Sequence, residues 1–305
     1  MRHLLTLFDL TAGEIHRIFE ISATLKQQLK DGVREQQLAG RMMALLFEKQ
    51  SLRTRVSFET LMTQLGGGSL FLGQDVGWGS RESRQDFAQV LSGMVDIIVC
   101  RAESHDTIEQ LAKYSSCPVV NGLSDEAHPC QALTDLFTVR EVLGSLEGAK
   151  LAFVGDANNV ARSLAIACGQ LGISMAIASP AGYQFDQSFV DQLQARNLEF
   201  QLVQTTDPRE AAEGASAVYA DVWTSMGQES EQEERRRAFA PFQVTNELMS
   251  LARQGACFLH CMPAHRGEEV TAEVADGPQS AMIQQAINRL HVQKGLVVWL
   301  LAGES

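Results

Sequence analysis

The stretch Ser51-Leu52-Arg53-Thr54-Arg55 places hydroxyl and guanidinium groups at the start of a predicted helix, directly after the apolar run 42–47. Ser51 suits the N-cap position, and the free N–H groups of a helix start attract anions. Arg53 and Arg55 add planar forks that match phosphate oxygens. The spacing therefore predicts phosphate binding. An ordinary capped helix, whose arginines are solvated or pair with nearby glutamates, is the alternative.

A second polar segment, His128-Pro129-Cys130-Gln131, follows the apolar run 118–120, and the proline suits the first position of a helix. Ligands of open α/β sheets bind beyond the carboxyl ends of the strands. At such a place His128 can donate to a carbonyl oxygen and Gln131 can orient an amide. A structural turn with a capping histidine is the alternative.

Two more charged residues stand out later in the chain. Asp221 follows the apolar run 217–220 and can accept hydrogen bonds from an ammonium group. The charged stretch 229–237 after it is interpreted as a solvated surface helix or a mobile loop. Arg289 lies in an otherwise apolar helix pattern, where burial is costly unless the guanidinium meets an anion or a carbonyl group. An exposed arginine is the alternative there.

The segment 153–161 runs from an apolar stretch through Gly155 into a helix pattern, as a dinucleotide-binding turn does. Asp156-Ala157 replaces the second glycine of that fingerprint, and no clear ribose-binding acid follows about 20 residues on. A nicotinamide-dependent dehydrogenase is therefore a weaker interpretation. The paired amides of Asn158 and Asn159 suit an amino-acid carboxylate better than a pyrophosphate.

Cysteine and histidine cluster in the segment 257–270. Cys257 and Cys261 are four residues apart, without the compact C-x-x-C pair of structural zinc sites, so we expect no metal. Cys261 stands alone at a predicted strand end beside Pro263, which favours a role in a site.

Short apolar runs alternate with helix-periodic segments along the whole chain, which indicates parallel sheets wrapped by helices. The fold class predicted is α/β, with two similar-sized doubly wound domains. The linker 144–148 divides them into residues 1–144 and 145–278. We expect the last helix, about 279–305 with its tail, to pack back across the junction and to join the first domain.

The composition excludes several classes of protein. The 305 residues carry 25 Lys and Arg against 37 Asp and Glu, a net charge of −12. An acidic chain has little attraction for nucleic acid or anionic lipid, so neither is an expected partner. No apolar stretch approaches the length of a membrane span, no signal-peptide pattern is seen, and the six cysteines lack framework spacing. We expect a cytoplasmic protein with reduced thiols.

Together these segments, in this order, resemble the carbamoyltransferase family over essentially the whole chain. Ser51 to Arg55 is similar to its carbamoyl-phosphate signature, and Arg101 with the segment 128–131 is similar to its carbonyl-polarising groups. The segment 221–227 resembles the ornithine-specific loop. His260-Cys261-Met262-Pro263 resembles the His-Cys-Leu-Pro signature of the ornithine branch, with Met262 in place of leucine.

The resemblance implies transfer of the carbamoyl group of carbamoyl phosphate to the δ-amine of L-ornithine, giving L-citrulline and phosphate in arginine biosynthesis. It implies a homotrimer and requires no cofactor. The implied catalytic residues are Arg101, His128, Asp221 and Cys261. The implied carbamoyl-phosphate ligands are Ser51, Leu52, Arg53, Thr54, Arg101, His128, Gln131, Cys261, Met262 and Arg289, and the implied ornithine ligands are Asn159, Asp221, Ser225 and Met226.

The chain also departs from the ornithine pattern. Leu52 replaces a threonine, as in some N-acetylornithine and N-succinylornithine relatives, which also carry a tryptophan in the following loop, as Trp78 does here. Gln74 is out of register with a glutamine that the family usually presents from that loop. An acylated α-nitrogen has no charge for Asp221 to bind, which favours ornithine over its acylated forms. A non-catalytic paralogue is a further alternative.

Overall fold

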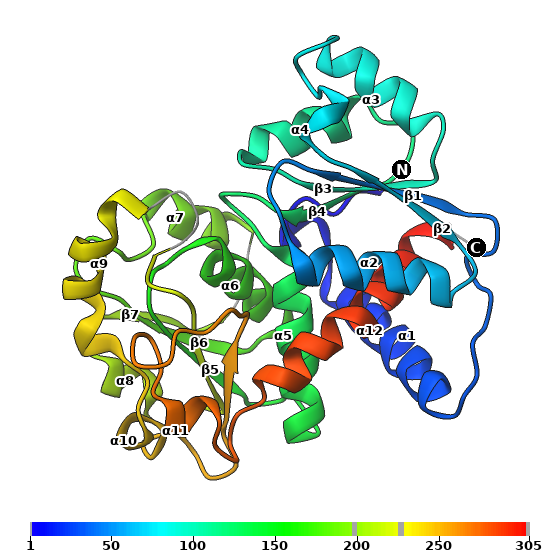
Figure 1. Cartoon of the computed structure of the whole chain (residues 1–305). Helices are drawn as coiled ribbons and strands as arrows, with labels where there is room; N and C mark the ends of the chain where they lie inside the picture. Colours follow the sequence, from blue (N-terminus) through cyan, green and yellow to red (C-terminus); the bar gives the residue numbers. More distant parts are fainter. Residues whose placement is uncertain (1, 197–199, 225–228, 303–305) are drawn as a thin grey trace. The chain divides into compact units, whose positions relative to one another are not determined.

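The described residues, 2–196, 200–224 and 229–302, contain two parallel β-sheets in a computed structural model of the chain (Figure 1). Two compact units carry one sheet each: unit 1 comprises Met1–Leu133 and Asn288–Ser305, and unit 2 comprises Thr134–Ile287. Over these residues, no helix is both long and apolar enough to cross a bilayer.

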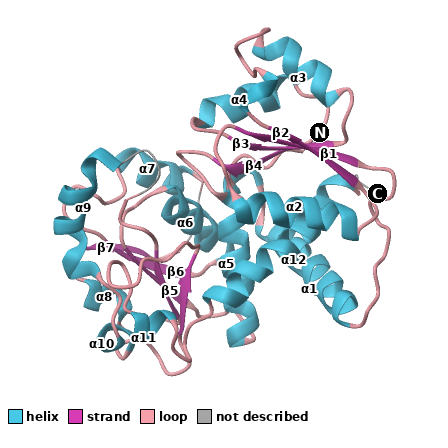
Figure 2. Ribbon diagram, viewed as in Figure 1, coloured by secondary structure: helices cyan, strands magenta, loops and turns pink. Residues whose placement is uncertain are grey.

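Unit 1 is built on a four-stranded sheet in the order β2-β1-β3-β4, all parallel. Its strands are β1 (Met42–Phe47), β2 (Gly68–Leu72), β3 (Ile97–Arg101) and β4 (Val119–Leu123). Its helical segments are η1 (Leu7–Asp9), α1 (Ala12–Lys30), α2 (Leu52–Gln64), η2 (Gln74–Val76), α3 (Arg84–Ser92) and α4 (His105–Tyr114). Helices α3 and α4 cover one face of the sheet, and α1 and α2 lie on the other (Figures 1 and 2).

Unit 2 is built on a five-stranded sheet in the order β7-β6-β5-β8-β9, also parallel throughout. Its strands are β5 (Lys150–Val154), β6 (Ser174–Ala178), β7 (Leu202–Thr205), β8 (Ala217–Ala220) and β9 (Cys257–His260). Its helical segments are α6 (Asn159–Leu171), α7 (Gln187–Ala195), α8 (Pro208–Ala212), η3 (Glu229–Glu231), α9 (Gln232–Phe239), η4 (Ala240–Phe242), α10 (Asn246–Met249) and α11 (Ala272–Ala275). Two further helices, α5 (Pro129–Leu143) and α12 (Met282–Leu301), have residues in both units.

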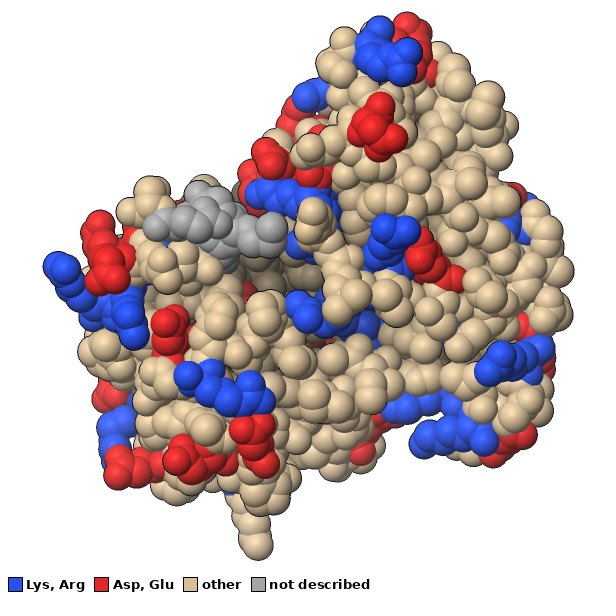
Figure 3. All heavy atoms as spheres, in the orientation of Figure 1, with Lys and Arg blue, Asp and Glu red and all other residues tan. Residues whose placement is uncertain are grey.

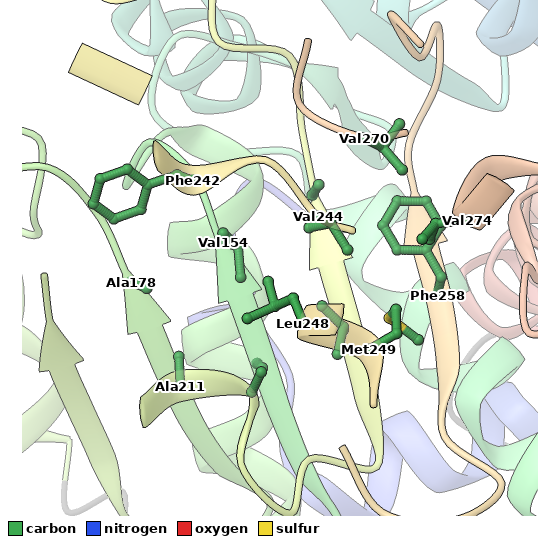
Figure 4. Close-up of a cluster of buried hydrophobic side chains, with 14 of the residues drawn as sticks. Val154, Ala178, Ala211, Phe242, Val244, Leu248, Met249, Phe258, Val270 and Val274 are labelled. Carbon is green, nitrogen blue, oxygen red and sulfur yellow. The ribbon is translucent and has the colours of Figure 1, made fainter. Parts of the chain in front are cut away.

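An apolar core fixes the second sheet against its short helices (Figure 4). Val154 of β5 and Phe258 of β9 are fully buried and pack with Leu248 and Met249 of α10. Strands buried in this way read as continuous apolar runs, because both faces of a parallel sheet are covered. The core therefore holds the carboxyl ends of β5, β8 and β9 in fixed register.

Each sheet reverses its strand order once. In unit 1, β1 is followed along the chain by β2 on one side and β3 on the other, and in unit 2, β5 is flanked by β6 and β8 in the same way. The strand ends beside such a switch point are where open α/β sheets bind ligands. The segments after β1 and β3 and those after β5 and β8 are therefore the places to look for a site.

The two-sheet α/β fold predicted from the sequence is confirmed, with several element ends shifted. The strand predicted at 118–120 extends to Leu123, so Asn121 belongs to β4 rather than to the loop. Asn121 fits there because its side chain donates to the carbonyl oxygen of Leu5 at 2.9 Å. The units divide inside α5 and α12, whereas the predicted domain boundaries lie at 144/145 and near 279, so the domain assignment stays a prediction.

Candidate active site

The candidate site residues of unit 1 gather at the start of α2. Ser51 is the N-cap, and its hydroxyl accepts from the N–H of Thr54 at 3.3 Å. Leu52 at the first helical position is 75% exposed, whereas Thr54 two residues further is buried. The helix start therefore presents backbone N–H groups beside β1, at the switch point of the unit 1 sheet.

Arg289 of α12 is buried against this helix start, which settles the choice that its sequence context left open. Only 4% of the residue is exposed, and its guanidinium donates to the Thr54 hydroxyl at 2.7 Å and to the Gln131 side-chain oxygen at 3.1 Å. Thr54 lies 235 positions from Arg289 in the sequence, and Gln131 lies 158 positions from it. The two hydrogen bonds place a fixed positive charge beside the α2 N-terminus.

His128 lies within the field of several arginines of unit 1. Burial, and after it the positive charges of Arg289, Arg101 and Arg53, lower the pKa of His128 well below its ordinary value. The imidazole is therefore neutral at neutral pH, and it can polarise a carbonyl oxygen only as a neutral hydrogen-bond donor. Arg101 itself ends β3 and is largely buried.

The candidate site residues of unit 2 centre on Asp221, directly after β8. One carboxylate oxygen accepts from the Asn158 side-chain amide at 2.8 Å, and the other accepts from the Cys261 thiol at 2.9 Å and from the N–H of Val222 at 2.8 Å. Asp221 is buried and Cys261 is half-buried. A buried carboxylate held by three donors is a pre-oriented acceptor for a cation.

The turn after β9 is held by a buried histidine. The Nδ1 atom of His260 accepts from the N–H of Met262 at 2.8 Å, so its Nε2 atom donates to Glu269, at 3.1 Å. Both side chains are buried. Met262 has a φ of 60°, a conformation that side chains rarely adopt, and the hydrogen bond to its N–H stabilises it. The geometry sets the direction of the Cys261 and Met262 carbonyl groups.

The structure brings the predicted residues together as two groups, one in each unit. In unit 1, Arg289 donates to both Thr54 and Gln131, and the charges of Arg53, Arg101 and Arg289 act on His128. In unit 2, Asp221 and Cys261 are bonded directly. Asn159 begins α6 beside Asn158. Ser225 and Met226 lie outside the described residues.

Some contacts of the site residues, and the burial within one charged segment, were not predicted from the sequence. The bond from Asn158 to Asp221 was not predicted, and its signal was the place of Asn158 as the N-cap of α6, one residue before the helix. The charged stretch 229–237 is not simply a solvated helix, because Arg235 within it is buried and bonded to Asp156. No spacing pattern in the sequence links those two residues.

Among the residues that the structure describes, two groups of side chains have the composition of a metal site. Asp221, His260 and Cys261 form one, and His265, Glu268 and Glu269 form the other, each with its possible ligand atoms within 4.8 Å of one another. In the first group the Cys261 thiol donates to Asp221 and both His260 nitrogens have hydrogen-bond partners. A metal there would have to displace these bonds.

The doubly wound units, with an arginine-lined helix start in one and a fixed buried carboxylate in the other, define a two-part α/β enzyme for an anion and an amine. Residues 2–141 match the carbamoyl-P binding domain of the aspartate/ornithine carbamoyltransferases, and residues 147–300 match their Asp/Orn binding domain. The chain therefore belongs to the aspartate/ornithine carbamoyltransferase family.

Similar proteins within the family are named for ornithine. The chain is 48% identical to an ornithine carbamoyltransferase of Bacillus subtilis, over 100% of this chain and 95% of the relative. A relative of the same name from Halalkalibacterium halodurans is also 48% identical, over 99% and 96%. The solved ornithine carbamoyltransferase of Pyrococcus furiosus superimposes with a TM-score of 0.95 at 45% identity, covering 100% of this chain and 98% of that one.

Proposed function

We propose that this protein is an ornithine carbamoyltransferase, which transfers the carbamoyl group of carbamoyl phosphate to the δ-amine of L-ornithine and releases L-citrulline and phosphate. The observation that carries the substrate assignment is the buried Asp221 carboxylate, held by Asn158 and Cys261. A free α-ammonium group is its natural partner, whereas an acylated α-nitrogen carries no charge. Relatives at 48% identity bear the same name.

In the proposed carbamoyl-phosphate site, the phosphate group is bound by the N-terminus of α2. The backbone of Ser51 to Thr54 supplies N–H donors, and Arg53 and Arg101 neutralise the phosphate oxygens. The face shown in Figure 3 mixes acidic and basic residues, so an anion gains its selectivity from this local group rather than from the net charge of −12.

The carbamoyl carbonyl is polarised where negative charge grows as the amine attacks. Thr54, Arg101 and neutral His128 are the proposed donors to that oxygen, and each well-placed donor of this type is worth several kcal/mol. Gln131 and Arg289 of unit 1 are proposed to hold the carbamoyl amide. Leu52 contributes its backbone N–H only.

The proposed ornithine site binds both the α-ammonium and the α-carboxylate of the substrate. Asp221 and Ser225 bind the α-ammonium, and Asn159 with the backbone at Met226 binds the α-carboxylate. The attacking δ-amine must be neutral, although its ordinary pKa is near 10, so a proton leaves before attack. Asp221 and Cys261 align that amine. The amine then attacks the carbamoyl carbon directly: the N–C bond forms, the C–O bond to phosphate breaks, and phosphate departs with that electron pair and takes up the proton that the attacking nitrogen loses. The proposal needs neither a covalent enzyme intermediate nor a cofactor.

A substrate panel tests this function. Carbamoyl phosphate is mixed in turn with L-ornithine, N-acetylornithine, N-succinylornithine, putrescine and L-aspartate, and phosphate release is scored together with the carbamoylated product. We expect turnover with L-ornithine at least about tenfold above each of the others, because only ornithine has a free α-ammonium, an α-carboxylate and a δ-amine together. Preference for an acylated ornithine, or no turnover with any amine, would reject the assignment.

We also propose that the enzyme works in the cytoplasm, in arginine biosynthesis, as a homotrimer. Five of the six cysteines are buried as small side chains of the core, and their spacing in the sequence is not that of a disulfide framework, which supports a reducing compartment. Leu52, Val56 and Phe71 of unit 1 are exposed apolar side chains of the kind that subunit contacts cover. Light scattering on the purified protein should give three times the mass of one chain, and a monomer in dilute solution would argue against the trimer.

A further inference from the structure

Arg235 is the buried cation of a helix whose other charged residues are exposed. It lies in α9, where Glu233, Glu234, Arg236 and Arg237 face solvent, yet only 4% of Arg235 is accessible. Burying a guanidinium costs free energy unless several acceptors surround it. The contacts of this side chain must therefore explain its burial.

Three acceptors and two aromatic rings surround the guanidinium group. Its Nε atom donates to the carbonyl oxygen of Trp223 at 2.6 Å, one terminal nitrogen pairs with Asp156, and the other reaches Glu231 at 3.4 Å. The group also lies over the rings of Tyr183 and Phe239, 4.9 and 5.5 Å from the ring centroids. Stacking and a planar fork are properties of arginine that lysine does not share.

The two principal acceptors belong to the two segments that carry the amine-reading residues. Asp156 lies in the turn after β5, two residues before Asn158. Trp223 lies after β8, two residues beyond Asp221. Asn158 and Asp221 in turn bond each other at 2.8 Å. One guanidinium thus joins the segment after β5, which carries Asn158, to the segment after β8, which carries Asp221.

The Arg235 cation stabilises the ionised form of Asp156. The Asp156 side chain is only 15% exposed. Burial raises the pKa of Asp156, and the charges of Asp221 and Glu231 act in the same direction, while Arg235 opposes them. Without the guanidinium, a desolvated carboxylate would face Asp221 in the same part of unit 2, and the turn after β5 would have to move or take up a proton.

We propose that Arg235 is a positioning residue for amino-acid recognition: by joining Asp156 to the Trp223 carbonyl it fixes Asn158 and Asp221 in the geometry that reads the α-ammonium group. This proposal rests on the function proposed above. We call Arg235, Asp156 and Trp223 the Arg235 clamp. The clamp acts on the amino-acid substrate and not on carbamoyl phosphate, whose proposed ligands at the α2 N-terminus belong to unit 1.

Steady-state kinetics of clamp variants test this role. Arg235→Met keeps an unbranched apolar stem but removes the donors, and we expect the KM for L-ornithine to rise about tenfold or more while the KM for carbamoyl phosphate changes less than about twofold. Arg235→Lys keeps the charge and should recover part of the loss. Asp156→Asn is nearly isosteric and should raise the same KM. In Arg235→Met it should add little, because the pair is already broken.

Arg237→Met provides the matched control, since Arg237 lies in the same helix and is exposed. It should leave both KM values unchanged. Wild-type KM for ornithine in both Arg235→Met and Asp156→Asn would overturn the clamp, as would an equal rise in both KM values. If Arg235→Met does not fold, Arg235→Lys and Asp156→Asn decide by the same criteria. Failure of the wild-type enzyme to make citrulline would overturn the proposed function and the clamp together, whereas normal wild-type turnover with unaffected variants overturns the clamp alone.

Discussion

His128 shows how a single side chain is tuned by its surroundings. Burial and the charges of Arg289, Arg101 and Arg53 depress its pKa, so the native state binds this proton less readily than the unfolded chain does. The protein therefore loses stability as the pH falls below the ordinary histidine pKa of about 6.5, because the unfolded chain takes up the proton first. Above that pH His128 neither adds to nor subtracts from the pH dependence.

We therefore expect His128 to remain neutral well into the acid range. The ¹⁵N chemical shifts of the seven histidine side chains can be followed by NMR from pH 7.5 to 5.5, and His128→Asn identifies the signal. Its resonance should stay at the neutral position throughout. Titration with a midpoint at or above 6.5 would contradict the electrostatic description of the unit 1 site.

Replacing Asp221 should weaken binding of the amino-acid substrate. Asp221→Ala removes the carboxylate that accepts from Asn158 and Cys261, and with it the proposed partner of the α-ammonium. A charge-assisted hydrogen bond is worth about 1.5–3 kcal/mol, so the KM for L-ornithine should rise about 10- to 100-fold in steady-state assays.

The KM for carbamoyl phosphate should stay within about threefold of the wild-type value, because a variant that only disturbs the fold would affect both substrates. Asp191→Ala, at an exposed position in α7 of the same unit, is the control and should change neither value. Equal effects of Asp221→Ala on the two KM values would reject the assignment of Asp221.

At the scale of secondary structure, comparing the N-caps of α2 and α3 distinguishes the effect of a cap on protein stability from its effect on phosphate binding. Ser51 caps α2 and Ser83 caps α3, each accepting from the N–H three residues on, at 3.3 and 3.0 Å. Replacing either with alanine should lower the free energy of unfolding by about 1 kcal/mol, measured by urea denaturation. Only Ser51→Ala should also raise the KM for carbamoyl phosphate, by about three- to tenfold, because α2 alone is proposed to bind phosphate. The same rise in Ser83→Ala would show that the effect is indirect.

Elements with a strong local signal were predicted from the sequence. Strands β1 and β8 have the predicted bounds and α5 begins at the predicted Pro129, because continuous apolar runs and a proline at a first helical position define them locally. The extension of β4 to Leu123 was missed, since Asn121 reads as a turn residue until its partner Leu5 is known.

The contacts among the candidate site residues of each unit could not be predicted in the same way. Arg289 bonds a residue 235 positions away, and Arg235 bonds one 79 positions away, and no periodicity within a segment reports such pairs. The family resemblance supplied the residue types of the site. The burial of Arg235 and the Asn158 to Asp221 bond required the folded chain.

For the whole molecule, ligand binding should appear as added stability. A ligand at ten times its Kd raises the free energy of unfolding by about 1.4 kcal/mol, so saturating inorganic phosphate should raise the Tm by a few degrees in differential scanning fluorimetry. Arg53→Met should abolish most of this shift, because the proposed phosphate site loses a cation. NADH should give no shift, and a shift with NADH but none with phosphate would favour the dehydrogenase interpretation.

The two units have separate proposed roles: unit 1 binds carbamoyl phosphate through the start of α2, and unit 2 binds a free amino acid through Asp221. A crystal structure of the protein with carbamoyl phosphate and L-norvaline, which has the chain of ornithine without the reacting δ-amine, tests both parts at once. We predict the phosphate group on the N–H groups of residues 51–54 with Arg53 and Arg101, and the norvaline ammonium on Asp221. Phosphate bound elsewhere, or an ammonium group away from Asp221, would contradict the account.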